Sequence, residues 1–206
     1  MKKIIITLLL LTFVFSISYT SFASTGLSDV DGTKYEEAVG ELMKLGIIDG
    51  YPEGKFYPEN VLKRNEMTKL IIHAYGMTND DVETYYNSMT SGDVYTDVDG
   101  NWAMKYIYVG SDLNLVSGYS DGTFRPNEEA TYGDAIQWCL NILYRKNVIK
   151  SNSKDLITSL NLLNNITYSS ETESITRGNA SIMLWNTINI IKKNSIKILR
   201  ICFRSC

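Results

Sequence analysis

The chain contains an internal repeat, and this repeat limits the folds available to it more than any other feature. A shift of 68 positions aligns residues 27–76 with residues 95–144 without a gap. Ten aligned positions are identical, and in the first copy these are Asp29, Val30, Asp31, Gly32, Leu45, Gly50, Tyr51, Gly54, Phe56 and Pro58. Two copies of one supersecondary unit are expected to fold alike and to bury their apolar faces against each other.

Each copy is predicted to begin with a helix. In the first copy Thr33 and Glu36 have the spacing of a capping box, and Gly46 is expected to end the helix in a left-handed conformation. In the second copy Asn101 is the expected N-cap and Asn114 the expected left-handed residue. Helical spacing predicts one apolar face on each helix, formed by Tyr35, Ala38, Val39, Leu42 and Leu45 in the first and by Trp102, Tyr106, Ile107 and Leu113 in the second.

An ordered loop is predicted after each of these helices, with the pattern Gly-Tyr, acid-Gly, Phe-x-Pro. Gly54 and Gly122 each follow an acidic residue, as expected in a turn that needs a positive φ. Phe56 and Phe124 are expected to anchor the two loops. The proline two residues after each phenylalanine is expected to keep the chain extended before the next helix.

A second helix is predicted after each loop, and a third place in the chain has the same kind of start. These helices are expected to open at Lys63, Thr131 and Thr176, and Thr131-x-x-Asp134 has the spacing of a capping box. The predicted core faces are Met67, Leu70, Ile71 and Ala74 in the first, Ile136, Leu140 and Leu143 in the second, and Ala180, Met183, Leu184 and Ile188 in the third. Trp138 and Cys139 are expected at the edges of the second face.

The rest of the chain divides by composition. Residues 1–23 are predicted to be a signal peptide, because Lys2 and Lys3 precede an apolar run that ends in a small-x-small site. Residues 27–76 and 95–145 form the two units, residues 77–94 a linker with a short helix over 80–89, and residues 155–190 a degenerate third unit. Residues 191–206 form a basic tail, which is either a helix on an anionic membrane surface or a truncated or out-of-frame end.

Charge and composition argue against several classes of function. Beyond the predicted signal peptide the chain has 18 basic and 23 acidic side chains, a net charge of −5, so no nucleic-acid partner is expected. Three cysteines do not form a disulfide framework. With His73 alone no multi-histidine metal site can form, and Asp97–Gly100 lacks the spacing of an EF-hand loop. A Cys139–His73 dyad is conceivable, but both residues fit helix positions without it. We therefore expect no metal, no cofactor and no catalytic activity.

One stretch resembles a known family in detail. The segment "YTDVDGNWAMKYIYVGSDLNLVSGYSDGTFRPNEEATYGDA" from Tyr95 to Ala135 is similar to an S-layer homology repeat. The first unit shares the loop and keeps Arg64 and Glu66 at the helix start, but has Lys34 where the family has tryptophan. This resemblance implies a mainly α fold, in which helix–loop–helix repeats pack as a pseudo-threefold unit around a central helix bundle. It also implies a secreted protein at the bacterial cell wall, held there non-covalently.

The resemblance implies that grooves between repeats bind secondary cell-wall polysaccharide, often through a pyruvate ketal. A ketal carboxylate suits a charge-assisted bond from arginine, and an arginine in the first turn of a helix adds free backbone N–H groups. The matching arginines are Arg64 and Arg177. The matching loop and wall positions are Tyr51, Tyr119, Trp102, Asp121, Gly54 and Gly122. Tyr132 replaces the arginine of the second unit, so at most two grooves are expected to be competent.

The candidate residues also have structural interpretations. Trp102, Phe56 and Phe124 fit core positions, the loop glycines fit turns, and the arginines could be solvated or ion-paired helix ends. Arg64 is expected to contact ligand more strongly than Arg177, because Tyr51 and Gly54 belong to a complete loop of its own unit. The alternative function is a cell-surface assembly scaffold that binds other surface proteins and no polysaccharide.

Overall fold

The computed structural model describes residues 24–90 and 95–204, with side chains as far as Ile196. The predicted signal peptide lies outside the described residues. The helices are α2 (Glu36–Lys44), α3 (Arg64–Tyr75), α4 (Asn79–Ser88), α5 (Met104–Asp112), α6 (Tyr132–Arg145), η1 (Lys154–Leu156), α7 (Ile157–Leu160) and α8 (Arg177–Arg204). Extended pairing in this part of the chain is limited to isolated bridges. The expectation of a mainly α fold is confirmed.

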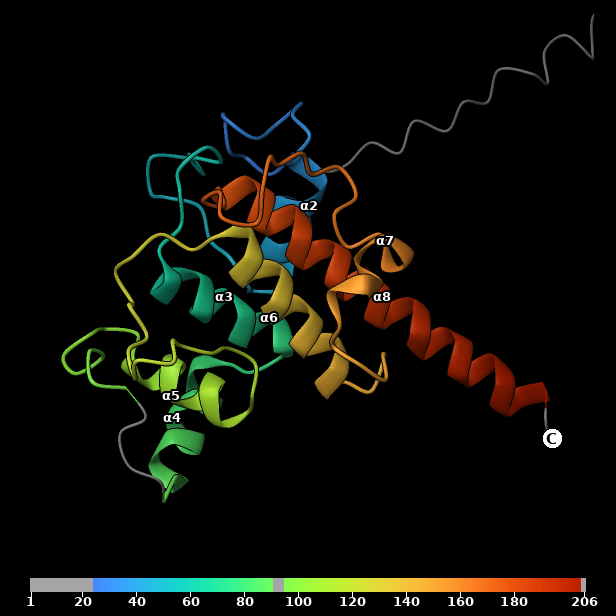
Figure 1. Ribbon diagram of the computed structural model, residues 1–206. Helices are drawn as coiled ribbons and strands as arrows, with labels where there is room; N and C mark the ends of the chain where they lie inside the picture. Colours follow the sequence, from blue (N-terminus) through green and yellow to red (C-terminus); the bar gives the residue numbers. More distant parts are fainter. Residues whose placement is uncertain (1–23, 91–94, 205–206) are drawn as a thin grey trace, which may run out of the picture.

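Three long helices form the centre of the molecule, one from each unit (Figure 1). The helices α3, α6 and α8 all contact one another. The outer helix of each unit packs on the central helix of a different unit: α2 on α8, α5 on α3, and η1 on α6. Each unit therefore depends on its neighbour for the burial of its outer helix. No helix within the described ranges is both long and apolar enough to cross a membrane.

A closed ring of backbone hydrogen bonds joins the three units just before the central helices begin. The Leu62 N–H donates to Ile175 O at 3.1 Å, and the Ile175 N–H donates to Ala130 O at 2.8 Å. The Ala130 N–H closes the ring by donating to Leu62 O at 2.9 Å. These three residues have equivalent positions in the three units, so the ring has the pseudo-threefold symmetry that the resemblance implied.

The first turn of each central helix is completed by the neighbouring unit. A helix leaves its first N–H groups without partners inside the helix. Here the first residue of each central helix donates to a loop carbonyl of another unit: Arg64 to Glu128, Tyr132 to Glu173, and Arg177 to Asn60, at 2.9, 2.9 and 2.8 Å. These three bonds run from the first unit to the second, from the second to the third and from the third to the first. Each helix start is therefore held against the loop of the next unit.

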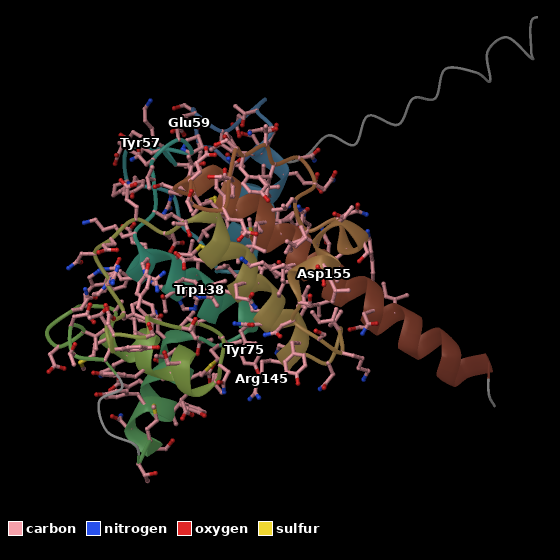
Figure 2. All side chains as sticks on the ribbon, viewed as in Figure 1. Tyr57, Glu59, Tyr75, Trp138, Arg145 and Asp155 are labelled. Carbon is pink, nitrogen blue, oxygen red and sulfur yellow. The ribbon has the colours of Figure 1, made fainter. Side chains whose placement is uncertain are left out.

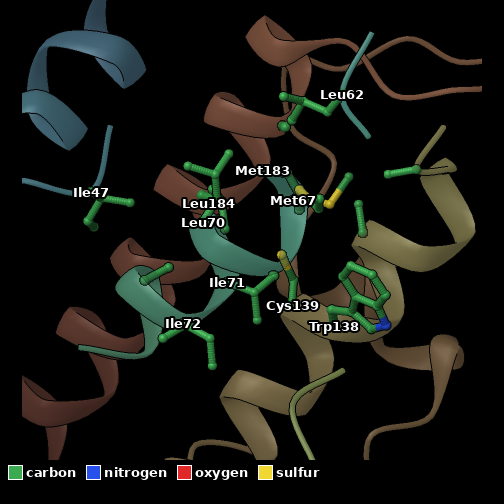
Figure 3. Packing of buried hydrophobic residues seen from close by; sticks show 14 of the residues in the cluster. Ile47, Leu62, Met67, Leu70, Ile71, Ile72, Trp138, Cys139, Met183 and Leu184 are labelled. Carbon is green, nitrogen blue, oxygen red and sulfur yellow. The ribbon is translucent and has the colours of Figure 1, made fainter. Parts of the chain in front are cut away.

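The core lies between the three central helices (Figure 3). The predicted faces of α3 and α6 are buried, as are Ala180, Met183 and Leu184 of α8, while Ile188 is half-buried. The expectation that Trp138 and Cys139 lie at the edges of the α6 face is wrong, because both are fully buried. Helix α6 has α3 and α8 on two sides, and the Trp138 ring stacks on Phe124 at a centroid distance of 6.1 Å.

The helix starts of the first two outer helices differ from the prediction. Helix α2 begins two residues later than a Thr33 N-cap predicts, because its N-cap is Tyr35. The Thr33 hydroxyl accepts from the Tyr35 N–H at 3.2 Å, and the Glu36 carboxylate accepts from the Gly32 N–H at 2.9 Å. The Asn101 side chain likewise accepts from the Ala103 N–H in the turn before α5. These side chains stabilise the turns that lead into the helices instead of capping the helices themselves.

The other predicted ends are confirmed. The residues after α2 and α5 are left-handed, with φ of 67° at Gly46 and 54° at Asn114. The Thr131 hydroxyl accepts from the Asp134 N–H at 3.1 Å and the Asp134 carboxylate accepts from the Thr131 N–H at 3.1 Å, which completes the predicted capping box. The spacer holds α4 where a short helix was expected, and the first helix of the third unit is reduced to η1 and α7.

Two residues that were assigned to apolar faces are exposed instead. Leu45 is 50% exposed and Trp102 is 58% exposed. Leu45 follows the last residue of α2, and Trp102 precedes the first turn of α5, so neither lies on the buried stripe of its helix. Both line the same surface groove.

Candidate functional site

The loop of each complete unit is folded around an aspartate from the start of that unit. The Asp29 carboxylate accepts from the N–H groups of Phe56 and Tyr57, both at 2.8 Å. Asp97 accepts from Phe124 and Arg125 in the same way, at 2.8 and 2.7 Å. This pairing explains why an aspartate and a Phe-x-Pro segment recur together in the repeat.

The loop backbone contains two left-handed residues in each unit. Gly54 and Gly122 have φ of 72° and 82°, which confirms the predicted turns. The residue between phenylalanine and proline is also left-handed, with φ of 56° at Tyr57 and 58° at Arg125. An extended segment was expected there, and the aspartate contacts account for the difference, because one carboxylate receives two consecutive N–H groups. The buried rings of Phe56 and Phe124 fix each loop to the core, as predicted.

Arg177, at the start of α8, inserts into the loop of the first unit. Its Nε donates to Phe56 O at 3.1 Å and its Nη2 donates to Asp49 O at 2.6 Å. Its Cζ lies 4.3 Å from the Phe56 ring centroid and 5.3 Å from that of Tyr51. The third unit therefore supplies the cation for the loop of the first.

Arg64, at the start of α3, occupies the same position in the loop of the second unit. Its Nε donates to Phe124 O and its Nη2 to Ser117 O, both at 2.9 Å. Its Cζ lies 4.9 Å from the Tyr119 ring centroid. The expectation that Arg64 shares a site with Tyr51 and Gly54 of its own unit is wrong, because the arginine of each unit reaches into the loop of the next.

The two arginines differ in burial and in charge compensation. Arg64 is 1% exposed, and its Nη1 lies 2.6 Å from Asp134 Oδ1. Arg177 is half-buried, and no carboxylate of the described residues lies within ion-pairing distance of it. Desolvation lowers the pKa of the Arg177 guanidinium, which nevertheless stays charged at neutral pH. Arg177 is thus a partly desolvated cation without a close counter-charge.

The position of Arg64 and Arg177 is occupied by a tyrosine at the start of the remaining central helix, and this tyrosine is buried. Tyr132, at the start of α6, is buried and stacks on Tyr168 at a centroid distance of 4.8 Å. Its hydroxyl accepts from Asn179 Nδ2 at 2.6 Å. The third unit lacks the Gly-Tyr-x-Asp-Gly loop, so the loop and the arginine that would enter it are lost at the same interface.

A groove of about 610 Å³ opens beside the Arg177 site. We call it the Arg177 groove, and its walls include Asp49, Tyr51, Glu66, Lys69, His73, Trp102 and Arg177. Three predicted site residues, Tyr51, Trp102 and Arg177, therefore meet in one groove although they come from three different units. The first loop lies at the edge of the molecule, where Tyr57 and Glu59 are labelled in Figure 2. Trp138 lies near the middle of the molecule in the same view.

Lys69 and His73 were missed among the candidate residues. Both lie on α3 with Glu66, at spacing i, i+3, i+7, which places them on one side of the helix. The signal was present in the sequence, because these three charged or titratable residues share one side of the helix, distinct from the predicted core face. The direction in which this side faces depends on α5 and α8, which pack on α3.

The equivalent region of the second unit is covered by the chain itself. Gln137 and Asn141 occupy the positions of Lys69 and His73. Asn141 Oδ1 accepts from Asn152 Nδ2 at 2.8 Å, and Gln137 Nε2 donates to Asn152 O at 3.3 Å. The remaining predicted residues of this loop are also engaged, because Arg125 pairs with Asp121 at 2.8 Å and lies 3.9 Å from the Tyr119 ring centroid. Ligand contacts by Arg64, Tyr119, Asp121 and Gly122 stay predictions.

The described residues give no support for the Cys139–His73 dyad. Cys139 is buried, and burial raises the pKa of its thiol to about 12, so it is not a ready nucleophile. His73 Nδ1 lies 2.8 Å from Met77 O, just beyond the end of α3. Within residues 24–90 and 95–204, no group of three or more histidine, cysteine, aspartate or glutamate side chains could hold a metal ion.

Comparison with known proteins gives matches to surface proteins of bacteria. The chain is 25% identical to the "Middle cell wall protein" of Brevibacillus brevis over 199 residues, which is 92% of the chain and 18% of that protein. It is 30% identical to a "Cell surface protein" of Thermoanaerobacter kivui over 175 residues, 80% of the chain and 22% of that protein. It is 28% identical to the "Cellulosome-anchoring protein" of Acetivibrio thermocellus over 104 residues, 48% of the chain and 21% of that protein.

The chain spans about a fifth of the length of these relatives. The similarities indicate a location at the cell wall or cell surface and a general role in anchoring there. The sequence model of the S-layer homology domain matches residues 26–68 and 94–136, which contain the two complete loops and the starts of α3 and α6. The chain therefore carries two repeats of the S-layer homology family.

Proposed function

We propose that the chain attaches non-covalently to the bacterial cell wall by binding pyruvylated secondary cell-wall polysaccharide in the Arg177 groove. The ketal carboxylate pairs with Arg177, and the rings of Tyr51 and Trp102 contact the apolar faces of the sugars. Support comes from the family match, from the cell-wall and anchoring proteins among the relatives, and from the geometry of the groove.

The observation that carries the proposal is that Arg177, among the described residues, has no carboxylate at ion-pairing distance. Its Nε and Nη2 each bond a loop carbonyl, and its Nη1 has no hydrogen-bond partner among the described residues. A partly desolvated cation without a counter-ion gains more from a bound carboxylate than a solvated one does. Arg64 already has Asp134 in that role, so Arg177 ranks first for ligand contact, which reverses the order that the sequence favoured.

The test is binding of the protein to purified cell walls before and after extraction of the pyruvylated polymer. We expect retention on intact walls and loss after extraction. In isothermal titration with a synthetic disaccharide that carries one pyruvate ketal, Arg177→Ala should reduce the affinity about ten- to a hundredfold, as expected for a hydrogen bond to a charged group. Arg125→Ala, which removes an exposed loop arginine, is the matched control and should leave the affinity unchanged.

Retention on walls that have lost the polymer would overturn the proposal. That result would favour the alternative, in which the repeats are a scaffold for cell-surface proteins. Equal affinity of wild type and Arg177→Ala for the disaccharide, with helical content intact by circular dichroism, would remove Arg177 from the site.

A further inference from the structure

A second hollow, of about 550 Å³, lies between the first and third units. We call it the Trp185 hollow. Its walls come from the start of α2, from α7 and the chain that follows it, and from α8, which lie next to one another in Figure 1. None of the residues that line it also lines the Arg177 groove. Its volume lies within the range of about 300–1,000 Å³ that is usual for sites of small ligands.

The Trp185 hollow is the counterpart of the Arg177 groove at another interface of the pseudo-threefold body. Asn186 on α8 has the position that His73 has on α3, and Lys34 has the position that Trp102 has before α5. The arginine of this third site is replaced by Tyr132, which is buried and does not line the hollow. The hollow therefore lacks the cation that suits a ketal carboxylate, and its ligand must be recognised in another way.

The floor of the hollow is apolar, and an indole ring forms part of its wall. Ala38 and Ile182 line it and are buried. Trp185 is half-buried, and its Nε1 donates to Glu37 Oε1 at 3.2 Å. Lys192 lies over one face of this ring, 4.5 Å from its centroid, and is not among the residues that line the hollow. The indole is thus fixed, and its remaining surface and the apolar floor suit the C–H face of a sugar ring.

Asparagine amides surround this apolar floor. Four asparagines line the hollow with side-chain amides that make no hydrogen bond within the described part of the chain: Asn161, Asn164, Asn165 and Asn189. A fifth, Asn186, donates from Nδ2 to Leu162 O and Asn164 O, both at 3.0 Å, and so ties the asparagine segment to α8. A carboxamide both donates and accepts hydrogen bonds. The best partner for these free amides is a group that also does both.

Most of the charged side chains of the hollow are already engaged. Lys34 Nζ donates to Asn179 Oδ1 at 3.3 Å, and Glu37 accepts from the Trp185 indole. Lys193 is exposed, so solvent and salt screen its charge. Among the described residues that line the hollow there is no arginine. A neutral, polar ligand therefore fits this lining better than an anion does.

We propose that the Trp185 hollow binds sugars that carry an acetamido group. The acetamido N–H and C=O pair with the asparagine amides, and its methyl group and the apolar face of the sugar contact the floor and the Trp185 ring. The ligand is uncharged, so this site is separate from the ketal site and does not rest on it. We expect a dissociation constant on the order of 1 mM, because a sugar exchanges bonds to water for a few bonds to solvated amides. Such a site alone is too weak to retain the chain on extracted walls.

The test uses the three tryptophans of the chain as reporters. Trp185 lies in the hollow, Trp102 lies in the Arg177 groove, and Trp138 is buried in the core. The full chain is titrated with a trimer of N-acetylglucosamine and followed by nitrogen–proton correlation NMR. We expect the indole signal of Trp185 to shift and the other two to stay. The glucose trimer with the same linkage lacks the acetamido groups and should bind about tenfold more weakly.

Two variants test the amides while Trp185 remains as the reporter. Asn165→Ala and Asn189→Ala should each weaken binding of the acetylated trimer about two- to tenfold, as expected for one neutral hydrogen bond. Asn87→Ala changes an exposed amide of α4 outside the hollow, and this matched control should reproduce the wild-type affinity. Wild-type affinity in both hollow variants would overturn the role of the amides.

The remaining outcomes separate this site from the proposed function. Equal binding of the two trimers would overturn the assignment to acetamido sugars, and no shift of Trp185 at about ten times the expected dissociation constant would overturn the site. Acetamido sugars occur in peptidoglycan strands and can also occur in the secondary polysaccharide, so solubilised fragments of each are titrated separately. A Trp185 shift with either one supports the proposal and names its source, and no shift with both would overturn it. A shift of Trp102 with the pyruvylated disaccharide reports on the proposed function alone.

Discussion

At the scale of single residues, Arg64 and Arg177 show how one repeat position can serve two purposes. Both are the first residue of a central helix, and both bond two carbonyls of a neighbouring loop. Asp134 neutralises Arg64, and the ring of Trp138 covers it from a further side, with 5.1 Å between Cζ and the ring centroid. Both arginines therefore hold two units together. Arg177 differs from Arg64 in that it also lines the Arg177 groove.

The first prediction concerns the stability of Arg64→Ala. We expect the free energy of unfolding to fall by about 3–5 kcal/mol, because the change removes a buried side chain together with its bonds to two loop carbonyls and its ion pair with the partly exposed Asp134. Urea denaturation followed by circular dichroism measures this. Arg125→Ala is the control, and since its ion pairs are exposed its change should stay within about 0.5 kcal/mol.

The contradicting outcome is specific. If Arg64→Ala unfolds at the wild-type urea concentration and yet fails to bind the pyruvylated disaccharide, Arg64 acts as a ligand contact and not as a buried tie between units.

The second prediction concerns Asp29 and acid. Desolvation alone would raise the pKa of this carboxyl, but the N–H groups of Phe56 and Tyr57 outweigh it and hold the pKa below its ordinary value. A carboxyl with a lowered pKa in the folded state contributes stability that is complete above about pH 4 and is lost as the pH falls through the folded pKa. Thermal melting between pH 2.5 and 7 should show Asp29→Asn less stable at pH 7 and less sensitive to acid. Identical pH profiles would refute this role.

At the scale of elements, the sequence correctly predicted those features of the helices that depend on residues close together along the chain. The left-handed Gly46 and Asn114, the capping box of Thr131, and the buried face of α3 all follow from local spacing, and all are confirmed. The prediction that Trp102 and Leu45 lie on buried helix faces was wrong, because helical spacing was extended past the residues where the helices begin and end. Periodicity defines a face, but the boundary of a helix depends on backbone bonds that the pattern does not show.

The third prediction tests the contact between α8 and the first unit. A Cβ on Gly178 would lie 2.5 Å from Tyr35 Cε1, and the Gly178 N–H donates to Pro58 O at 2.7 Å. Gly178→Ala should therefore lower the free energy of unfolding by about 1–3 kcal/mol, the usual cost of overpacking. Gly133→Ala is the matched control in α6, where the nearest atom is Glu171 O at 3.1 Å, so the strain is smaller and the helix propensity of alanine offsets it. Chemical denaturation of both variants decides the comparison, and equal stabilities would contradict it.

At the scale of the whole molecule, the arrangement could not be derived from one unit. The repeat predicted that the copies resemble each other, and the family resemblance implied a pseudo-threefold body. Neither showed that Arg64 enters the second loop and Arg177 the first. That exchange follows from the ring through Leu62, Ala130 and Ile175, whose bonds join residues far apart in sequence. The groove residues from three units meet for the same reason, so no single repeat contains the site.

The last prediction follows from this closure. Since α2 packs on α8, α5 on α3 and η1 on α6, loss of one central helix would uncover an outer helix of another unit. The three units should therefore unfold as one cooperative body. Met183→Ala in the core part of α8 should lower the free energy of unfolding by about 2–5 kcal/mol. Hydrogen exchange measured by mass spectrometry should then show the same loss of protection in peptides from α3, α6 and α8, while the exposed control Leu45→Ala leaves all three near wild type. Loss of protection in α8 alone, with α3 unchanged, would mean that the units are separate folding bodies and that the ring of backbone bonds does not couple them.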